Sequence, residues 1–169
     1  SGTTTNTLTF NYTVAAGHNS SNLDYLDTSA LVLNSGTIKD AATNDATLTL
    51  VSPGNANSLG ANKTLVIDTT IPVITLLGED PVTIEVGTTY TDAGATALDN
   101  FDGDITSSIV EVSTVDNPIV GTYTVTYNVT DANGNAAVQV TRNVIVVDTT
   151  VPVITLTGNA TVTIEVGAT

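Results

Sequence analysis

Acidic and amide side chains crowd into one short stretch of this chain. Residues 99–104 read Asp-Asn-Phe-Asp-Gly-Asp, and the side chains that could bind a cation there are Asp99, Asn100, Asp102 and Asp104. Ca²⁺ takes about six to eight oxygen ligands from carboxylates, carbonyls and water. Without a cation, carboxylates packed this closely repel one another. We therefore expect a calcium-binding loop, with a turn held by side-chain-to-backbone hydrogen bonds as the alternative.

The remaining composition argues against most other chemistry. The chain carries 17 acidic and 3 basic side chains, for a net charge of −14. Binding to nucleic acid or to an anionic membrane depends on Lys and Arg, so we expect neither partner. His18 is the single histidine, Cys is absent, and the sequence has no phosphate-loop or zinc motif. We expect no enzyme activity, no small-molecule substrate and, without an apolar run of about 20 residues, no membrane insertion.

The chain repeats itself at an interval of 80 residues (148 − 68 = 80). Residues 68–89 and 148–169 are identical at 16 of 22 positions, without a gap. A repeat of this length is long enough to form its own domain. We therefore predict a partial domain with only the later strands at 1–68, a complete domain at 69–148, and the first strands of a further repeat at 149–169.

Apolar and polar residues alternate through much of the chain, which predicts half-buried antiparallel strands. The clearest case is Thr122–Thr130, followed by the turn 131–135 with its Asn-Gly step and a partner strand at Ala136–Val147. A change of parity near Arg142 and Asn143 predicts a β-bulge. Further strands are expected at Val73–Leu77, Val82–Val86, Ile109–Val115, Leu8–Val14, Thr47–Val51 and Thr64–Ile67, with short ones near Tyr90–Asp92 and Ile105.

About seven short strands in each repeat predict an all-β fold of tandem immunoglobulin-like β-sandwiches. Tyr123 follows Gly121 at the start of the penultimate strand, as the tyrosine corner of such sandwiches does. In this topology, the loop before the last strand lies at the pole where the domain begins. Asp131, Asn133 and Asn135 should therefore approach Asp68, and loop 99–104 joins them if it connects the second and third strands.

The predicted metal site thus spans the entrance to the complete domain. Its expected ligands are Asp68, Asp99, Asn100, Asp102, Asp104, Asp131 and Asn133, and Asp148 should play the part of Asp68 for the next repeat. Pro72 and Pro152 each stand four residues after these joint aspartates and restrict the backbone. We expect each Asp-Thr-Thr-x-Pro segment to form a short, stiff joint.

Several motifs together resemble a known family. They are Asp-Thr-Thr-x-Pro, VTIEVG, TDAGATALDNFDGDIT and GTYTVTYNVTDANGNAA, in that order within 68–148. This arrangement resembles the bacterial Ig-like repeats of large secreted adhesins, and similar domains occur in some insecticidal crystal proteins. Residues 1–68 look like a second Ig-like subtype. The resemblance implies a secreted, non-catalytic stalk on the bacterial cell surface, with calcium at the joints.

The leading functional prediction is therefore a structural spacer of an adhesin or matrix protein, with neighbouring repeats as its partners. One alternative is a subunit of an extracellular fibre, a homopolymer in which half-domains of identical chains complete one another through strand pairing. A second alternative is a glycan- or surface-binding module. The small number of aromatic side chains, five Tyr, two Phe and no Trp, weakens the case for sugar stacking.

Overall fold

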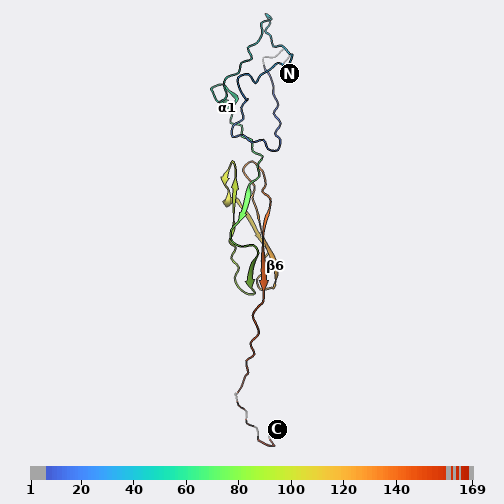
Figure 1. Ribbon diagram of the computed structural model, residues 1–169, viewed down its shortest axis with the longest axis vertical. Helices are drawn as coiled ribbons and strands as arrows, with labels where there is room; N and C mark the ends of the chain where they lie inside the picture. The colour runs from blue at the N-terminus through green and yellow to red at the C-terminus, as the bar shows by residue number, and fades with distance from the viewer. Residues whose placement is uncertain (1–6, 159–160, 162, 164, 168–169) are drawn as a thin grey trace.

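The computed structural model describes residues 7–158, 161, 163 and 165–167. These residues form an elongated molecule with three parts in chain order (Figure 1). An irregular N-terminal segment leads into a β-sandwich, and a single extended segment leaves the sandwich at its far pole. The described N-terminal and C-terminal segments therefore lie at opposite poles of the sandwich (Figure 1).

The sandwich consists of two sheets, which confirms the predicted all-β, Ig-like architecture. One sheet has the strand order β1-β3-β4, formed by β1 (Val73–Leu76), β3 (Ala95–Asp99) and β4 (Gly103–Asp104). The other has the order β2-β7-β6-β5, formed by β2 (Val82–Glu85), β7 (Val140–Val147), β6 (Gly121–Asn128) and β5 (Val110–Ser113). Strand pairs are antiparallel, except that β2 runs parallel to β7. The 3-10 turn η1 (Thr106–Ser108) leads from one sheet to the other.

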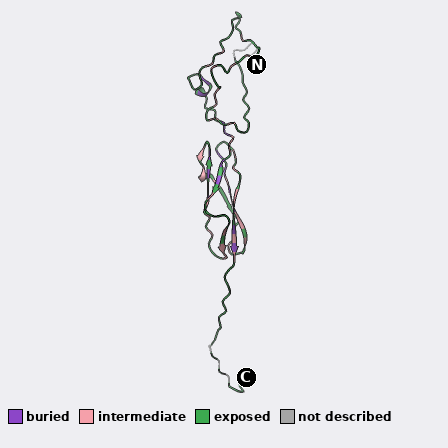
Figure 2. Ribbon diagram, viewed as in Figure 1, coloured by how far each residue is buried: buried purple, intermediate pink, exposed green. Residues whose placement is uncertain are grey.

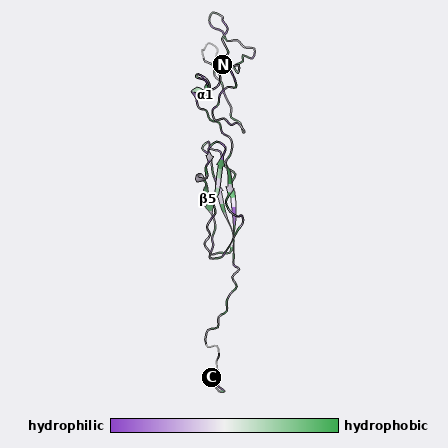
Figure 3. Ribbon diagram, turned by 60° about the vertical axis from the view of Figure 1, so that its left-hand side comes forward, coloured by the Kyte–Doolittle hydropathy of each residue, from purple (hydrophilic) through white to green (hydrophobic). Residues whose placement is uncertain are grey.

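The core lies between the two sheets, where alternate residues of each strand point inward. In β6, Val125 and Tyr127 are buried, and in β7 Val144 and Val146 are buried. The facing sheet contributes smaller side chains, among them Ala95 and Ala97 of β3. Buried residues gather in this middle part of the molecule (Figure 2), where the strands are also the most apolar stretches (Figure 3). The alternation in the sequence therefore corresponds to one buried and one exposed face per strand.

The hairpin between β6 and β7 forms as predicted. In its loop the Asp131 amide donates to the Asn135 carbonyl at 3.1 Å, and Gly134 adopts a positive φ of 93°, which suits a residue without a Cβ. At the start of β6 the Tyr123 hydroxyl donates to the Ile119 carbonyl at 2.9 Å. This bond back to the preceding backbone confirms the predicted tyrosine corner.

The predicted β-bulge at Arg142 and Asn143 is wrong. The pairing of β6 with β7 continues without interruption from Gly121 opposite Val146 to Tyr127 opposite Val140. Arg142 takes an inward position in the same alternation as Val144 and is fully buried, with 0% of its surface exposed. The apparent change of parity arose because a charged side chain occupies a core position.

The buried Arg142 guanidinium ties the two sheets together. It forms an ion pair with Asp92 and donates to the backbone carbonyls of Leu77, beyond the end of β1, and Gly94, just before β3. Tyr127 also donates to the Asp92 carboxylate, as does Tyr90 at 2.5 Å. Burial raises the pKa of Asp92, but hydrogen bonds from Tyr127 and Tyr90 outweigh it and hold that pKa below its usual value.

This network also explains two differences from the predicted strands. Residues 90–92 form no strand, and their polar side chains join this network: Tyr90 donates to Asp92, which pairs with Arg142. The expected strand near Ile105 is instead the short β4 just before it, and Ile105 caps η1. Strand β3 was not predicted, because Ala-Thr-Ala-Leu-Asp is weakly apolar. It forms because its small residues pack against β6 beneath the Arg142 network.

The N-terminal segment differs most from its prediction. Among residues 7–68, the strands expected at Leu8–Val14, Thr47–Val51 and Thr64–Ile67 do not form ladders. This part contains helix α1 (Leu59–Asn62) and isolated bridges between Ser20 and Ile67 and between Lys39 and Asp45. A strand requires a neighbouring strand for its backbone hydrogen bonds. The assignment of 1–68 to a partial Ig-like domain therefore stays a prediction.

The C-terminal segment extends from the sandwich without pairing over its described residues (Figure 1). Val153, Ile154 and Leu156 are about as exposed as in an isolated chain, at 86%, 93% and 92%. Residues 159–160, 162, 164 and 168–169 lie outside the described residues, so the further repeat at 149–169 also stays a prediction. Across the described parts of the chain, no helix reaches the length and apolarity of a bilayer span.

Replacing Asp92 with Asn should destabilise the sandwich strongly. The change leaves the Arg142 guanidinium buried without a counter-charge, and loss of one partner of a buried ion pair costs about 3–5 kcal/mol. Urea unfolding followed by circular dichroism measures this loss. Asp116→Asn is the matched control, because it removes an exposed carboxylate from the same domain. Equal unfolding midpoints for the two variants would show that the ion pair does not hold the sheets together.

Candidate metal centre

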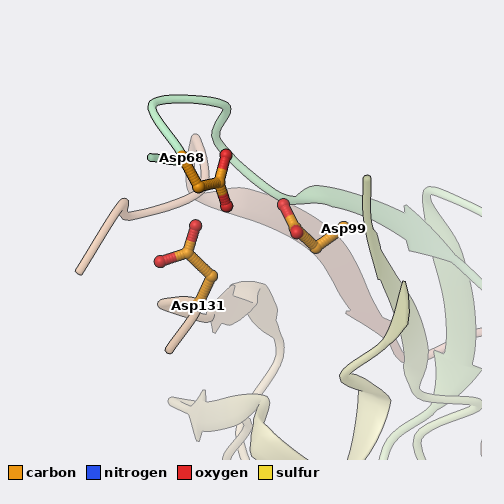
Figure 4. A group of neighbouring side chains, drawn as sticks. All are labelled: Asp68, Asp99 and Asp131. Carbon is orange, nitrogen blue, oxygen red and sulfur yellow. The ribbon is translucent and has the colours of Figure 1, made fainter. Parts of the chain in front are cut away.

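Three carboxylates converge where the N-terminal segment meets the sandwich. Asp68, Asp99 and Asp131 each offer an oxygen, and these oxygens lie within 4.8 Å of one another. Figure 4 shows the three side chains directed toward a common point. All three are buried, with exposed fractions of 9%, 4% and 7%. A buried group of like charges at this separation requires a compensating positive charge.

The fold places these residues from three separate parts of the chain. Asp68 is the joint residue that precedes the sandwich, Asp99 ends β3, and Asp131 opens the loop between β6 and β7. The ends of β3 and β6 lie at the pole where the chain enters the domain. This geometry agrees with the predicted convergence of Asp68, Asp99 and Asp131 on one pole.

The loop between β6 and β7 holds Asp131 in a fixed orientation. Its Oδ1 accepts hydrogen bonds from the backbone amides of Asn133 at 2.9 Å and Asn135 at 2.7 Å. The Asn135 side chain donates to Asp131 Oδ2 at 2.8 Å and to the Asp68 carbonyl at 3.2 Å. Burial raises the pKa of Asp131, but the hydrogen bonds from Asn135 and Asn133 prevail and lower it. Asp131 is therefore a carboxylate anion that is already oriented.

The other two carboxylates are each satisfied on one oxygen only. Asp99 Oδ1 accepts from the amides of Phe101 and Asp102, at 2.7 and 2.9 Å, and Asp68 Oδ1 accepts from the Thr70 amide at 3.0 Å. Oδ2 of Asp68 and Oδ2 of Asp99 are buried and have no hydrogen-bond partner among the described residues. An unpaired buried carboxylate oxygen is costly, and a bound cation would remove that cost.

No basic side chain supplies the missing charge. The ion pairs among the described residues are Lys39 with Asp45 and Arg142 with Asp92, and neither includes a member of the cluster. The donor set consists of carboxylates with amide and carbonyl oxygens nearby, which suits a hard cation such as Ca²⁺. The residues present therefore fit a metal ion at this point.

The remaining predicted ligands lie outside the cluster. Asp102 accepts the Ala132 amide through Oδ2 at 2.8 Å, so it joins loop 99–104 to loop 131–135. Asp104 turns away to accept the Thr106 amide at 2.9 Å. Asn100 and Asn133 have exposed side chains, and Asn133 contributes its backbone amide to Asp131. Loop 99–104 thus contributes one carboxylate, that of Asp99, to the cluster. Whether Asn100, Asp102, Asp104 and Asn133 bind a metal stays a prediction.

Asp148 lies at the opposite pole of the sandwich and is exposed. Its Oδ1 accepts the Thr150 amide at 3.1 Å, as Asp68 Oδ1 accepts the Thr70 amide. The two joint aspartates therefore share one local turn, although only Asp68 has two further carboxylates beside it. Whether Asp148 binds a metal stays a prediction.

Sequence reasoning did not find the polar contacts that orient the site. Asn135 bridges Asp131 and the joint, and it was expected close to the joint but not among the ligands. The loop 40–44 has the same bonding pattern: Asp40 Oδ1 accepts the Ala42 and Asn44 amides, and Asp40 Oδ2 accepts the Asn44 side chain. The shared spacing, Asp followed four residues later by Asn, is the signal that marks both loops.

Comparison with known proteins gives a family match for the sandwich. Residues 74–146 match the family model described as "Bacterial surface protein, Ig-like domain". The chain is also similar to hyalin of Strongylocentrotus purpuratus, at 37% identity over 107 residues, which cover 61% of this chain and 9% of hyalin. The chain therefore spans a small fraction of the length of this relative.

Among solved structures, the chain is similar to lipoprotein BT2262 from Bacteroides thetaiotaomicron, at 28% identity and a TM-score of 0.42, over 48% of this chain and 40% of that one. It is also similar to the CBM51-2 and INT domains of Clostridium perfringens ZmpB in complex with GlcNAc, at 29% identity and a TM-score of 0.38, over 46% and 16%. The matched family segment runs from β1 to β7 and so covers both sheets. This match supports a bacterial Ig-like domain at residues 74–146.

Proposed function

We propose that this chain is a non-catalytic structural repeat of an extracellular bacterial surface protein, and that Ca²⁺ stiffens the joint between its units. One observation carries the proposal. The joint residue Asp68 is buried against Asp99 and Asp131 of the following sandwich, and two of the carboxylate oxygens lack a partner among the described residues. The family match of residues 74–146 supports the surface location.

A cation at this point would act as a crosslink between the joint and the domain. Asp68 precedes the sandwich in the chain, whereas Asp99 ends strand β3 and Asp131 belongs to the loop between β6 and β7. An ion bound to all three would therefore fix the incoming chain to the pole of the domain. Pro72 is fully buried in the sandwich and further restricts the backbone four residues later. Together these contacts favour a stiff connection over a flexible tether.

The shape of the molecule suits a spacer. The entry joint (residues 68–70) and the exit joint (residues 148–150) lie at opposite poles of the sandwich, so successive units would form a rod (Figure 1). The same Asp-Thr-Thr sequence stands at both poles, at 68–70 and 148–150. A protein built from such units gains reach in proportion to the number of repeats. We infer that the biological task is to project a binding region from the cell surface, as in an adhesin.

A fibre subunit is the second candidate. Residues 153–156 carry the sequence Val-Ile-Thr-Leu, identical to that of β1, and expose their apolar side chains. Such a segment could pair with β3 of another copy in place of β1. Multi-angle light scattering across a range of concentrations separates the two candidates. A mass that grows with concentration favours the fibre, and a constant monomer mass favours the spacer.

Calcium should raise the melting temperature, and EDTA should lower it. Binding to the folded state alone stabilises it by about 2.7 kcal/mol when the free ion stands at 100 times its dissociation constant. Thermal melts followed by circular dichroism, in excess Ca²⁺ and in EDTA, measure the shift. Mg²⁺ serves as the comparison ion, because it demands a smaller, near-octahedral site. Superimposable melts in Ca²⁺ and EDTA would contradict the metal proposal.

Asp99→Asn should have opposite effects in the two conditions. In EDTA the variant should be more stable than the parent, because one of three mutually repelling carboxylates is gone while the amide oxygen still accepts from Phe101 and Asp102. In Ca²⁺ it should lose most of the calcium-dependent gain. The matched control is Asp116→Asn, which should keep the full gain. An Asp99→Asn variant with an unchanged calcium response would remove Asp99 from the site.

A further inference from the structure

The exit joint forms hydrogen bonds with a carboxylate that does not belong to the candidate metal site. Glu85, the last residue of β2, accepts four hydrogen bonds from two consecutive threonines. Its Oε1 accepts the Thr149 amide at 2.8 Å, the Thr150 amide at 3.2 Å and the Thr150 hydroxyl at 2.9 Å. Its Oε2 accepts the Thr149 hydroxyl at 2.8 Å. One side chain thereby satisfies the amide and hydroxyl groups of both threonines.

The entry joint has the same pair of threonines, and the preceding unit holds them in a similar way. The Thr69 amide donates to Asn19 Oδ1 at 2.8 Å, and the Asn19 side-chain amide donates to the Thr70 hydroxyl at 2.8 Å. The Thr69 hydroxyl accepts the Gly17 amide at 2.9 Å. Asn19 therefore binds both threonines of the entry joint, as Glu85 binds both at the exit joint, but it accepts from Thr69 and donates to Thr70.

At the entry joint, the order of the contacts is the reverse of the order of the residues in the chain. Asp68 comes first in sequence, yet its carboxylate faces the following sandwich. Thr69 and Thr70 come next, yet they bind back to the preceding segment. Bending at this joint would break either the contacts of Asp68 with the sandwich or those of the two threonines with the preceding segment. The metal site and the threonine contacts therefore restrict the linker from opposite directions.

We propose that Glu85 is a positioning residue, which binds the Thr149-Thr150 pair of the exit joint and thereby orients Asp148 toward the next repeat. The partner it recognises is an Asp-Thr-Thr segment, through the amides and hydroxyls of the two threonines. This inference rests on the proposed stalk function, but not on calcium. The sequence places Glu165 80 residues after Glu85 (165 − 85 = 80), within the second VTIEVG motif. The second VTIEVG motif therefore carries a carboxylate at the position equivalent to Glu85.

A carboxylate suits this position better than a neutral side chain. Hydrogen bonds to an ionised acceptor are roughly twice as strong as neutral ones. Both oxygens accept, and Oε1 alone takes three donors. Glutamine retains one accepting oxygen, so it should keep part of the contact, whereas alanine should lose it entirely. This graded order distinguishes a positioning role from a general effect on folding.

The first test measures amide hydrogen exchange by NMR on the full chain in EDTA. In Glu85→Ala, the Thr149 amide should exchange at least about tenfold faster, and the Thr150 amide, which also donates to Asp148, by a smaller factor. The Thr69 amide, which donates to Asn19, should not change. Glu85→Gln should lie between the parent and the alanine variant. Glu79→Ala removes an exposed carboxylate of the same domain and should leave all three amides unchanged. Unchanged exchange at Thr149 and Thr150 in Glu85→Ala would overturn the proposal.

The second test measures the direction of the exit segment. The chain has no Cys, so Val112→Cys and Val153→Cys allow one spin-label pair at two exposed sites, on β5 and beyond the joint. Glu85→Ala should broaden the distribution of label distances, and Glu79→Ala should not. An equal width in both would overturn the proposal. Both tests are carried out in EDTA, so their outcome does not depend on the metal proposal. The positioning role of Glu85 and the metal site can therefore be refuted independently.

Should Glu85→Ala disturb folding, Thr150→Val provides a second variant that leaves β2 intact. It removes one hydroxyl donor to Glu85 and keeps the Thr150 amide. The Thr149 and Thr150 amides should then exchange faster than in the parent, by a smaller factor than in Glu85→Ala. No change in either amide would contradict the proposed contact.

Discussion

The buried ion pair between Arg142 and Asp92 is the interaction on which the sandwich depends. Arg142 belongs to β7 in one sheet, and its guanidinium reaches carbonyls at the end of β1 and ahead of β3 in the other sheet. Small alanines in β3 and large residues in β6 and β7 leave room for this arrangement in the core. Because a buried charge is tolerated only with a partner, the ion pair specifies how the two sheets face each other.

That relation between the sheets also determines the geometry of the joint. Asp99 ends a strand of one sheet, and Asp131 follows a strand of the other. Their carboxylates meet Asp68 only because the sheets pack in one register. The domain thus uses its single basic residue to hold the core and leaves the acidic cluster without a counter-charge of its own. A strongly acidic chain of this kind attracts cations, which is consistent with the proposed metal at this cluster.

The joint combines two kinds of contact with different requirements. Threonine amides and hydroxyls bind to Asn19 or Glu85 by hydrogen bonds that need no ion. At the entry pole, Asp68 and Asp99 each have a buried carboxylate oxygen with no hydrogen-bond partner among the described residues. In a stalk that uses both kinds of contact, the threonine hydrogen bonds would hold each linker to the preceding unit. The carboxylates would attach the linker to the following unit when the ion is bound. The extended molecule in Figure 1 has the form that such joints would produce.

The sequence by itself determined strands β1, β2, β5, β6 and β7, the hairpin and the tyrosine corner, because these follow from local alternation and turn chemistry. It also placed Asp68, Asp99 and Asp131 at one pole, since sandwich topology follows from strand order. Only the tertiary structure decided that Arg142 is a core residue, that β3 forms, and that Asp104 turns away from the cluster. It alone paired Glu85 with Thr149 and Thr150, 64 and 65 residues distant. A charged side chain takes its role from its partner, and that partner is brought near only by the fold.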